Sequence, residues 1–123
     1  MGMALSPNFA FLAAEQRLLA EYGTLAEAYA FADPNTALVK LRQFTEVLVH
    51  ATAVRSGLYL TGEESLARLL TLLRDRSITN DRVHELLHGL RTEGNRAVHD
   101  GHDRRRDALH QLKMARIVGL WWY

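Results

Sequence analysis

At residues 88–99 the chain reads HGLRTEGNRAVH, where an apolar face meets residues that commonly end or begin helices. Gly94 can adopt the left-handed backbone conformation that suits a helix end. Asn95 is a good N-cap for a helix that follows. The stretch therefore predicts a turn between two helices, and this turn would bring Arg91, Asn95, Arg96 and His99 close together.

Composition narrows the class of protein. The chain has 123 residues, is 48% hydrophobic, carries a net charge of +1 and contains no cysteine. It is long enough for one domain, residues 1–123. It is not a generic polyanion binder, and it has neither disulfides nor thiolate metal sites. Without a membrane-spanning run or a signal pattern, the expected location is the cytoplasm.

Apolar residues recur at helical spacing along the whole chain. The predicted helices cover about residues 8–32, 34–56, 61–73, 81–91 and 104–123. Asp33-Pro34 is the strongest start signal, an N-cap followed by proline at the first helical position. Gly23 and Thr24, with Glu27 three residues later, indicate a split in the first helix. The expected fold is an all-α bundle of four to six helices with short loops and no sheet.

The chain closes on Leu120-Trp121-Trp122-Tyr123, without a glycine or proline stop signal. Such a cluster of aromatic residues is normally packed against other side chains. We therefore expect the chain to be the N-terminal fragment of a longer protein. The alternative is a natural C-terminus that docks on its own core.

Residues 84–88 read His-Glu-Leu-Leu-His and match the zinc-protease pattern. On a helix, His84 and His88 share a face and could bind zinc, with Glu85 as general base. Arg91 and Gly94 occupy the positions that would complete the longer pattern, and no strand is predicted that could align a peptide. The favoured interpretation is one partly buried histidine and one surface histidine.

Two further groups could carry chemistry. His99, His102 and His110 with Asp103 have metal-ligand spacing, but this signal is weak and we expect no metal. Basic residues mark the last helix and the central stretch, and a run of this kind is either a solvated face or a contact for nucleic acid. The candidate nucleic-acid-binding residues are Arg91, Arg96, Arg104, Arg105 and Arg106, with Lys113 and Arg116 on the same edge.

Several of these elements form one longer pattern. It comprises Asp33-Pro34-Asn35-Thr36, Arg42-x-Phe44-x-Glu46, the string from His88 to His99, and the terminal Trp-Trp-Tyr. The pattern resembles the N-terminal helical domain of the R subunit of type I restriction enzymes. The resemblance covers nearly the whole chain and gives Asp33, Pro34, Arg42, Glu46, Gly94 and Asn95 a structural role.

The same residues resemble the HEPN superfamily, whose members include ribonucleases with an Arg, a polar residue, three spacers and a His. Asn95 and His99 match the polar residue and the His, whereas Gly94 stands in the place of the Arg. Arg91 lies about one turn earlier and Arg96 directly follows. In metal-independent RNA cleavage, His99 would act as general acid or base and an arginine would stabilise the phosphate charge.

Three functions follow from the sequence. The favoured one is an accessory or docking domain of a restriction R subunit, without activity of its own. This domain would contact DNA, other domains of the R subunit, or the methyltransferase and specificity subunits. It would need no cofactor, although the parent enzyme would use ATP and Mg²⁺. The alternatives are a HEPN-type RNA-binding or RNA-cleaving domain and a stand-alone helical interaction module. Any of the three could form a homodimer, and no membrane contact is expected.

Overall fold

Helix α2, Pro34–Arg55, runs through the middle of the molecule and contacts each of the other α-helices. The computed structural model describes residues 3–123, which form five α-helices and one 3₁₀ turn and contain no strand. The other elements are η1 (Ala10–Leu12), α1 (Arg17–Tyr29), α3 (Leu66–Asp75), α4 (Asp81–Asp100) and α5 (Arg105–Trp122). The predicted all-α bundle is confirmed.

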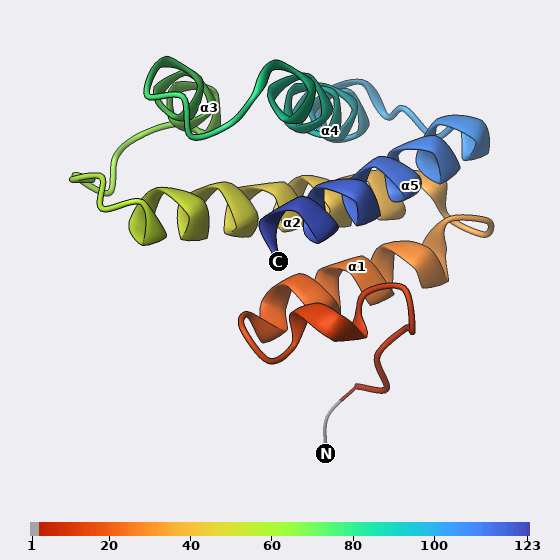
Figure 1. Ribbon diagram of the computed structural model, residues 1–123. Coiled ribbons are helices and arrows are strands. Elements are labelled where there is room, and N and C mark those ends of the chain that lie inside the picture. Colours follow the sequence, from red (N-terminus) through yellow and green to blue (C-terminus); the bar gives the residue numbers. More distant parts are fainter. Residues whose placement is uncertain (1–2) are drawn as a thin grey trace.

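The helices form three layers (Figure 1). Helices α3 and α4 lie on one side of the α2–α5 pair, and α1 lies on the other side. The core runs between these layers. At its centre the Phe9 and Phe44 rings meet edge to face with centroids 5.8 Å apart, and both side chains are fully buried.

The start of α2 follows the predicted Asp33-Pro34 signal. The Asp33 carboxylate accepts a hydrogen bond from the Thr36 amide at 3.2 Å, and Pro34 occupies the first helical turn. Hydrogen bonds from the Thr36 hydroxyl and amide lower the pKa of Asp33. At the other end, Gly57 has a φ of +76° and stops the helix. Both predicted ends of α2 are confirmed to within one residue.

The predicted split at Gly23 and Thr24 is wrong, because α1 runs through both residues. A Cβ atom on Gly23 would overlap the Phe9 ring, so this glycine provides space for a core aromatic residue. Thr24 and Glu27 do not form a capping box. Thr24 accepts a hydrogen bond from the Ser6 amide, and Glu27 accepts bonds from the Ser6 and Asn8 side chains. The chain bends earlier, between η1 and α1.

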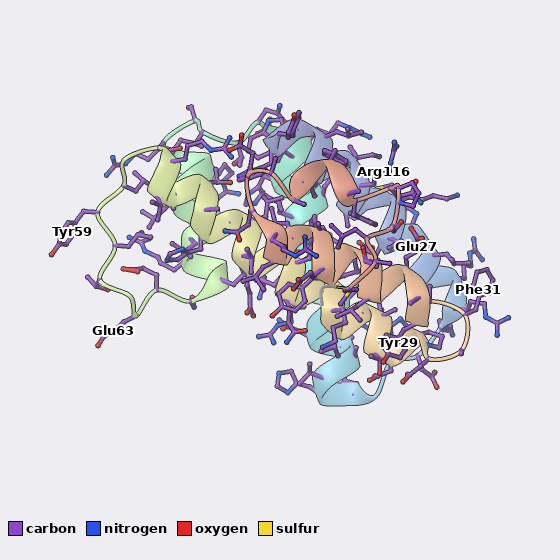
Figure 2. The ribbon with its side chains drawn as sticks, turned by 90° about the horizontal axis from the view of Figure 1, so that it is seen from below. Glu27, Tyr29, Phe31, Tyr59, Glu63 and Arg116 are labelled. Atoms are coloured by element: carbon purple, nitrogen blue, oxygen red, sulfur yellow. The ribbon has the colours of Figure 1, made fainter. Side chains whose placement is uncertain are left out.

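Helix α3 starts later than expected. Thr61 and Glu64 do interact, since the Glu64 carboxylate accepts bonds from the Thr61 amide and hydroxyl at 2.6 Å. This contact closes a loop and does not begin the helix. The N-cap is Ser65, whose hydroxyl accepts from the Arg68 amide. Tyr59, in the same loop, is 93% exposed and points away from the helices (Figure 2).

The predicted turn at residues 88–99 is also wrong, because α4 continues through it to Asp100. Gly94 is buried within this helix, where a Cβ atom would overlap the Cβ of Arg42 on α2. Its small size lets the two helices approach closely. Asn95 lies inside α4 and is not an N-cap; the helix is capped by Asn80, whose side chain accepts from the Val83 amide at 2.8 Å. The helix ends at Gly101, with a φ of +68°.

The C-terminal aromatic residues pack on the domain itself. Trp122 is only 6% exposed, and the Arg55 guanidinium lies 4.0 Å from its ring centroid. Tyr123 meets Phe11 edge to face. Across residues 3–123, none of the helices combines the length and the apolar character that a membrane span requires.

Candidate functional site

One side of α4 carries a row of polar side chains, which we call the α4 polar stripe: His84, His88, Arg91, Asn95 and His99. Their spacing of three or four residues places them along one side of a helix. The buried residues of α4, such as Leu87 and Leu90, face the core. An uninterrupted helix therefore still aligns Arg91, Asn95 and His99, which the sequence expected to meet in a turn. Arg96 lies outside this row.

The first half of the stripe borders a cavity of about 220 Å³ between α3 and α4, which we call the α3–α4 cavity. Its lining residues are Ala67, Leu70, Thr71, Arg74, His84, His88 and Arg91. Arg74 from α3 approaches His84, with 3.4 Å between Arg74 Nη1 and His84 Nε2. Burial, the Arg74 charge and His88 together lower the pKa of His84, against smaller opposing effects of Asp81 and Glu85. The cavity is therefore an electropositive site.

This environment argues against the zinc-protease hypothesis. The His84 and His88 rings are stacked with centroids 6.4 Å apart, but Arg74 and Arg91 line the same cavity and would repel a cation. Glu85 is exposed. Within residues 3–123, His84 and His88 have no third ligand close enough to complete a metal site.

The second half of the stripe is open to solvent. His99 is exposed and Asn95 is half-buried. Arg96 forms an ion pair with Glu93, with 3.0 Å between Nη1 and Oε1, so its charge is already partnered. The predicted pair of Arg42 and Glu46 is present, with 3.5 Å between Arg42 Nη2 and Glu46 Oε1. The Arg42 side chain fills the space that a side chain at position 94 would occupy.

One residue of the predicted basic edge, Arg105, contacts another part of the domain. Arg105 donates to the Phe31 carbonyl at 3.0 and 3.2 Å, and its guanidinium lies 5.4 Å from the Phe31 ring centroid. This contact joins the start of α5 to the loop between α1 and α2. Arg104 and Arg106 are exposed, as are Lys113 and Arg116. Their binding to nucleic acid stays a prediction.

A cluster of Glu93, His102 and Asp107 was missed by the sequence analysis. His102 Nε2 lies 2.9 Å from Asp107 Oδ2 and 3.1 Å from Glu93 Oε2, and the His102 side chain is only 9% exposed. These three groups have the right types and proximity to hold a metal ion. These side chains also contact one another directly, and the contacts connect the end of α4 to the start of α5. Of the predicted set, His102 belongs to this cluster, whereas His99, Asp103 and His110 do not.

Sequence spacing could not have revealed this cluster, because Glu93 and His102 are brought together by the end of α4. Asn35 of α2 holds that end, since its side-chain amide donates to the carbonyls of Ala97 and His102 at 2.8 and 2.9 Å. The Asp-Pro-Asn element noted in the sequence thus has two structural functions. Asp33 caps the start of α2, and Asn35 binds carbonyl groups at the end of α4.

Comparison with known proteins shows which family the chain belongs to. It is 34% identical over 118 residues to the type I restriction enzyme EcoKI endonuclease subunit of Escherichia coli (strain K12). This alignment covers 94% of the chain and 10% of that subunit, so the chain spans about a tenth of the length of this curated relative. No solved structure matches. Residues 24–118, most of the chain, match the model of the family described as Domain of unknown function (DUF4145), and the chain therefore belongs to the DUF4145 family.

Proposed function

We propose that this protein is an accessory docking domain of a type I restriction-modification endonuclease subunit, in the cytoplasm and without catalytic activity of its own. The observation that supports it most is the extent of the similarity. It includes almost the entire chain but only a tenth of a much longer endonuclease subunit. A whole domain that corresponds to a small part of a larger enzyme suits a role in assembly. The alignment says nothing about the other nine tenths of that subunit.

The surface of the domain offers a place for such contacts. A groove of about 740 Å³ lies between the start of α1 and the second half of α2, and Trp122 lines one part of it. Leu18 and Val54 line the groove and are 46% and 58% exposed. An exposed apolar groove with a polar rim is typical of a protein-interaction site. We propose that another domain of the same restriction subunit occupies it.

A chimeric subunit tests this proposal. This chain would replace the homologous tenth of the EcoKI endonuclease subunit, and restriction of unmodified phage DNA would be measured. We expect Val54→Glu to reduce restriction at least about tenfold, because it places a charge in an apolar contact. Tyr59→Glu is the matched control, since Tyr59 is more exposed and lies outside the groove.

Two outcomes would contradict the proposal. One is equal restriction by both variants. The other is full restriction by a subunit from which the region has been deleted, because the domain would then be dispensable, whereas a docking domain is needed. Circular dichroism of each purified variant separates a lost contact from a lost fold.

A HEPN-type RNA-cleaving domain is the second candidate, supported by the alignment of Arg91, Asn95 and His99 on one side of α4. The test is an assay on labelled single-stranded RNA with and without EDTA, together with His99→Ala. His99 is exposed, so this variant should fold. Under the docking proposal no lane shows cleavage. Cleavage that survives EDTA and disappears in His99→Ala would favour the hypothesis of a HEPN-type ribonuclease.

A further inference from the structure

The α3–α4 cavity presents mainly nitrogen donors. Four of its seven lining residues carry them: Arg74 from α3, and His84, His88 and Arg91 from α4. Among the described residues, none of those lining it is acidic. Carboxylates beside these residues are those of Asp75, with Oδ1 3.9 Å from Arg74 Nε, and of Asp81 and Glu85, whose effects on the pKa of His84 are smaller than those of burial, Arg74 and His88. The charge that faces the cavity is positive.

Two of these donors lack a hydrogen-bond partner within residues 3–123. They are Arg91 Nε and His84 Nδ1, and both atoms are buried. Since Arg74 can only donate, His84 Nε2 must accept from it, and the proton of the neutral ring then sits on Nδ1. Buried N–H groups without an acceptor are rare in folded proteins, because each costs about 1–3 kcal/mol. Both atoms belong to side chains that line the cavity.

We propose that the α3–α4 cavity binds a phosphate group, either as free phosphate or as a phosphodiester of a nucleic acid strand. Arginine and histidine together are well suited to such an oxyanion, because both make charge-assisted hydrogen bonds. The size agrees, since about 220 Å³ lies below the range of about 300–1,000 Å³ typical of sites for larger organic ligands. One tetrahedral anion fits, and a nucleobase would have to stay outside. This site does not depend on the docking function.

The histidines make binding depend on pH. A bound anion favours the charged form of His84, so binding strengthens as the pH falls from the ordinary histidine pKa of about 6.5. Burial and the neighbouring charges hold the pKa of His84 below that value, which moves its contribution to lower pH. Sulfate is the probe for this measurement, because its own charge does not change in this range.

The experiment uses the full 123-residue chain and follows the histidine side-chain NMR signals. Inorganic phosphate and a short single-stranded oligonucleotide are titrated separately. Arg91→Gln should weaken binding of whichever probe binds by at least about tenfold, as expected for loss of a hydrogen bond to a charged group. His88→Gln should weaken it less, and because His88 is exposed this variant should fold. Arg82→Gln is the control, since Arg82 is an exposed arginine of α4 that does not line the cavity.

The two probes distinguish the sources of the phosphate group. Binding of both identifies a general phosphate site, and binding of the oligonucleotide alone identifies a phosphodiester site; either supports the proposal. It is overturned if neither probe shifts the His84 and His88 signals. It is also overturned if Arg82→Gln weakens binding as much as Arg91→Gln does, because the attraction would then be that of the whole surface.

Discussion

Two glycines near the end of α4 have opposite functions. Gly94 lies inside the helix and is buried, and a Cβ atom there would overlap Arg42 of α2. Gly101 lies just beyond the helix with a φ of +68°, and nothing stands within 4 Å of where its Cβ would be. The first glycine is required for its size, and the second for its backbone conformation. A glycine in a helical pattern is therefore not by itself a stop signal.

The surroundings of the two glycines explain the difference. At Gly94 the backbones of α2 and α4 approach closely, and the Arg42 side chain covers the contact. At Gly101 the chain reverses, and the Asn35 side chain holds the freed carbonyl groups of Ala97 and His102. Both regions are stabilised by residues from α2. At position 94 there is no room for a side chain. At position 101 there is room for one, but the backbone has a positive φ that most residues avoid.

The largest effect is expected for Gly94→Ala. The added methyl group meets the Cβ of Arg42, which cannot move without its backbone, so the α2–α4 contact must open. Overpacking of this kind costs about 3 kcal/mol, of which alanine recovers about 1 kcal/mol through its helix propensity. We expect a net loss of about 2 kcal/mol in the free energy of unfolding, measured with urea.

Gly89→Ala is the matched control, since it makes the same substitution in the same helix. The nearest atoms to a Cβ at Gly89 belong to the flexible Gln111 side chain, at 3.8 and 3.9 Å, so alanine fits. This variant should be neutral or stabilised by up to about 1 kcal/mol. A Gly94→Ala protein as stable as Gly89→Ala would show that close approach is not what requires Gly94.

A smaller effect is expected for Gly101→Ala. No atom obstructs the new methyl group, so only the left-handed backbone conformation opposes it. That conformation costs an ordinary residue about 1 kcal/mol, which thermal unfolding can measure. Gly101→Asn should recover part of the loss, since asparagine tolerates this region better. Equal losses for alanine and asparagine would point to a steric cause and weaken the comparison.

The smallest effect is expected for Asn95→Ala. The sequence predicted an N-cap, whose removal would cost about 1 kcal/mol. In the structure Asn95 lies within α4, so alanine should change the free energy of unfolding by at most about 0.5 kcal/mol, in the stabilising direction. Asn80→Ala is the control, because Asn80 does cap α4 and should lose about 1 kcal/mol. The contrast fails if the two variants lose the same amount.

The sequence predicted most of the fold correctly. The all-α class, both ends of α2 and the starts of α4 and α5 are confirmed. Helix α3 starts at Leu66 and not near Thr61. Two further errors, at Gly23 and Gly94, share one cause. Each of these glycines lies in a helix and leaves space for a side chain from another element, Phe9 or Arg42. No pattern of neighbouring residues carries that information.

The candidate site was predicted less well. The sequence identified Arg91, Asn95 and His99, and the structure aligns them on α4. It also matched His84 and His88 to a zinc motif, whereas the structure surrounds them with arginines. The cluster of Glu93, His102 and Asp107 was not anticipated, because residues from two helices and the loop between them converge only after folding.

The helical class and the starts of α2 and α4 were thus determined by the sequence alone, since the caps Asp33 and Asn80 bind backbone amides only three residues away. The length of α4 and the charge of the α3–α4 cavity were decided by tertiary structure. Both depend on contacts between distant segments, Arg42 with Gly94 and Arg74 with His84. A local signal acts through hydrogen bonds within one turn, whereas the environment of a side chain is set by whatever packs against it.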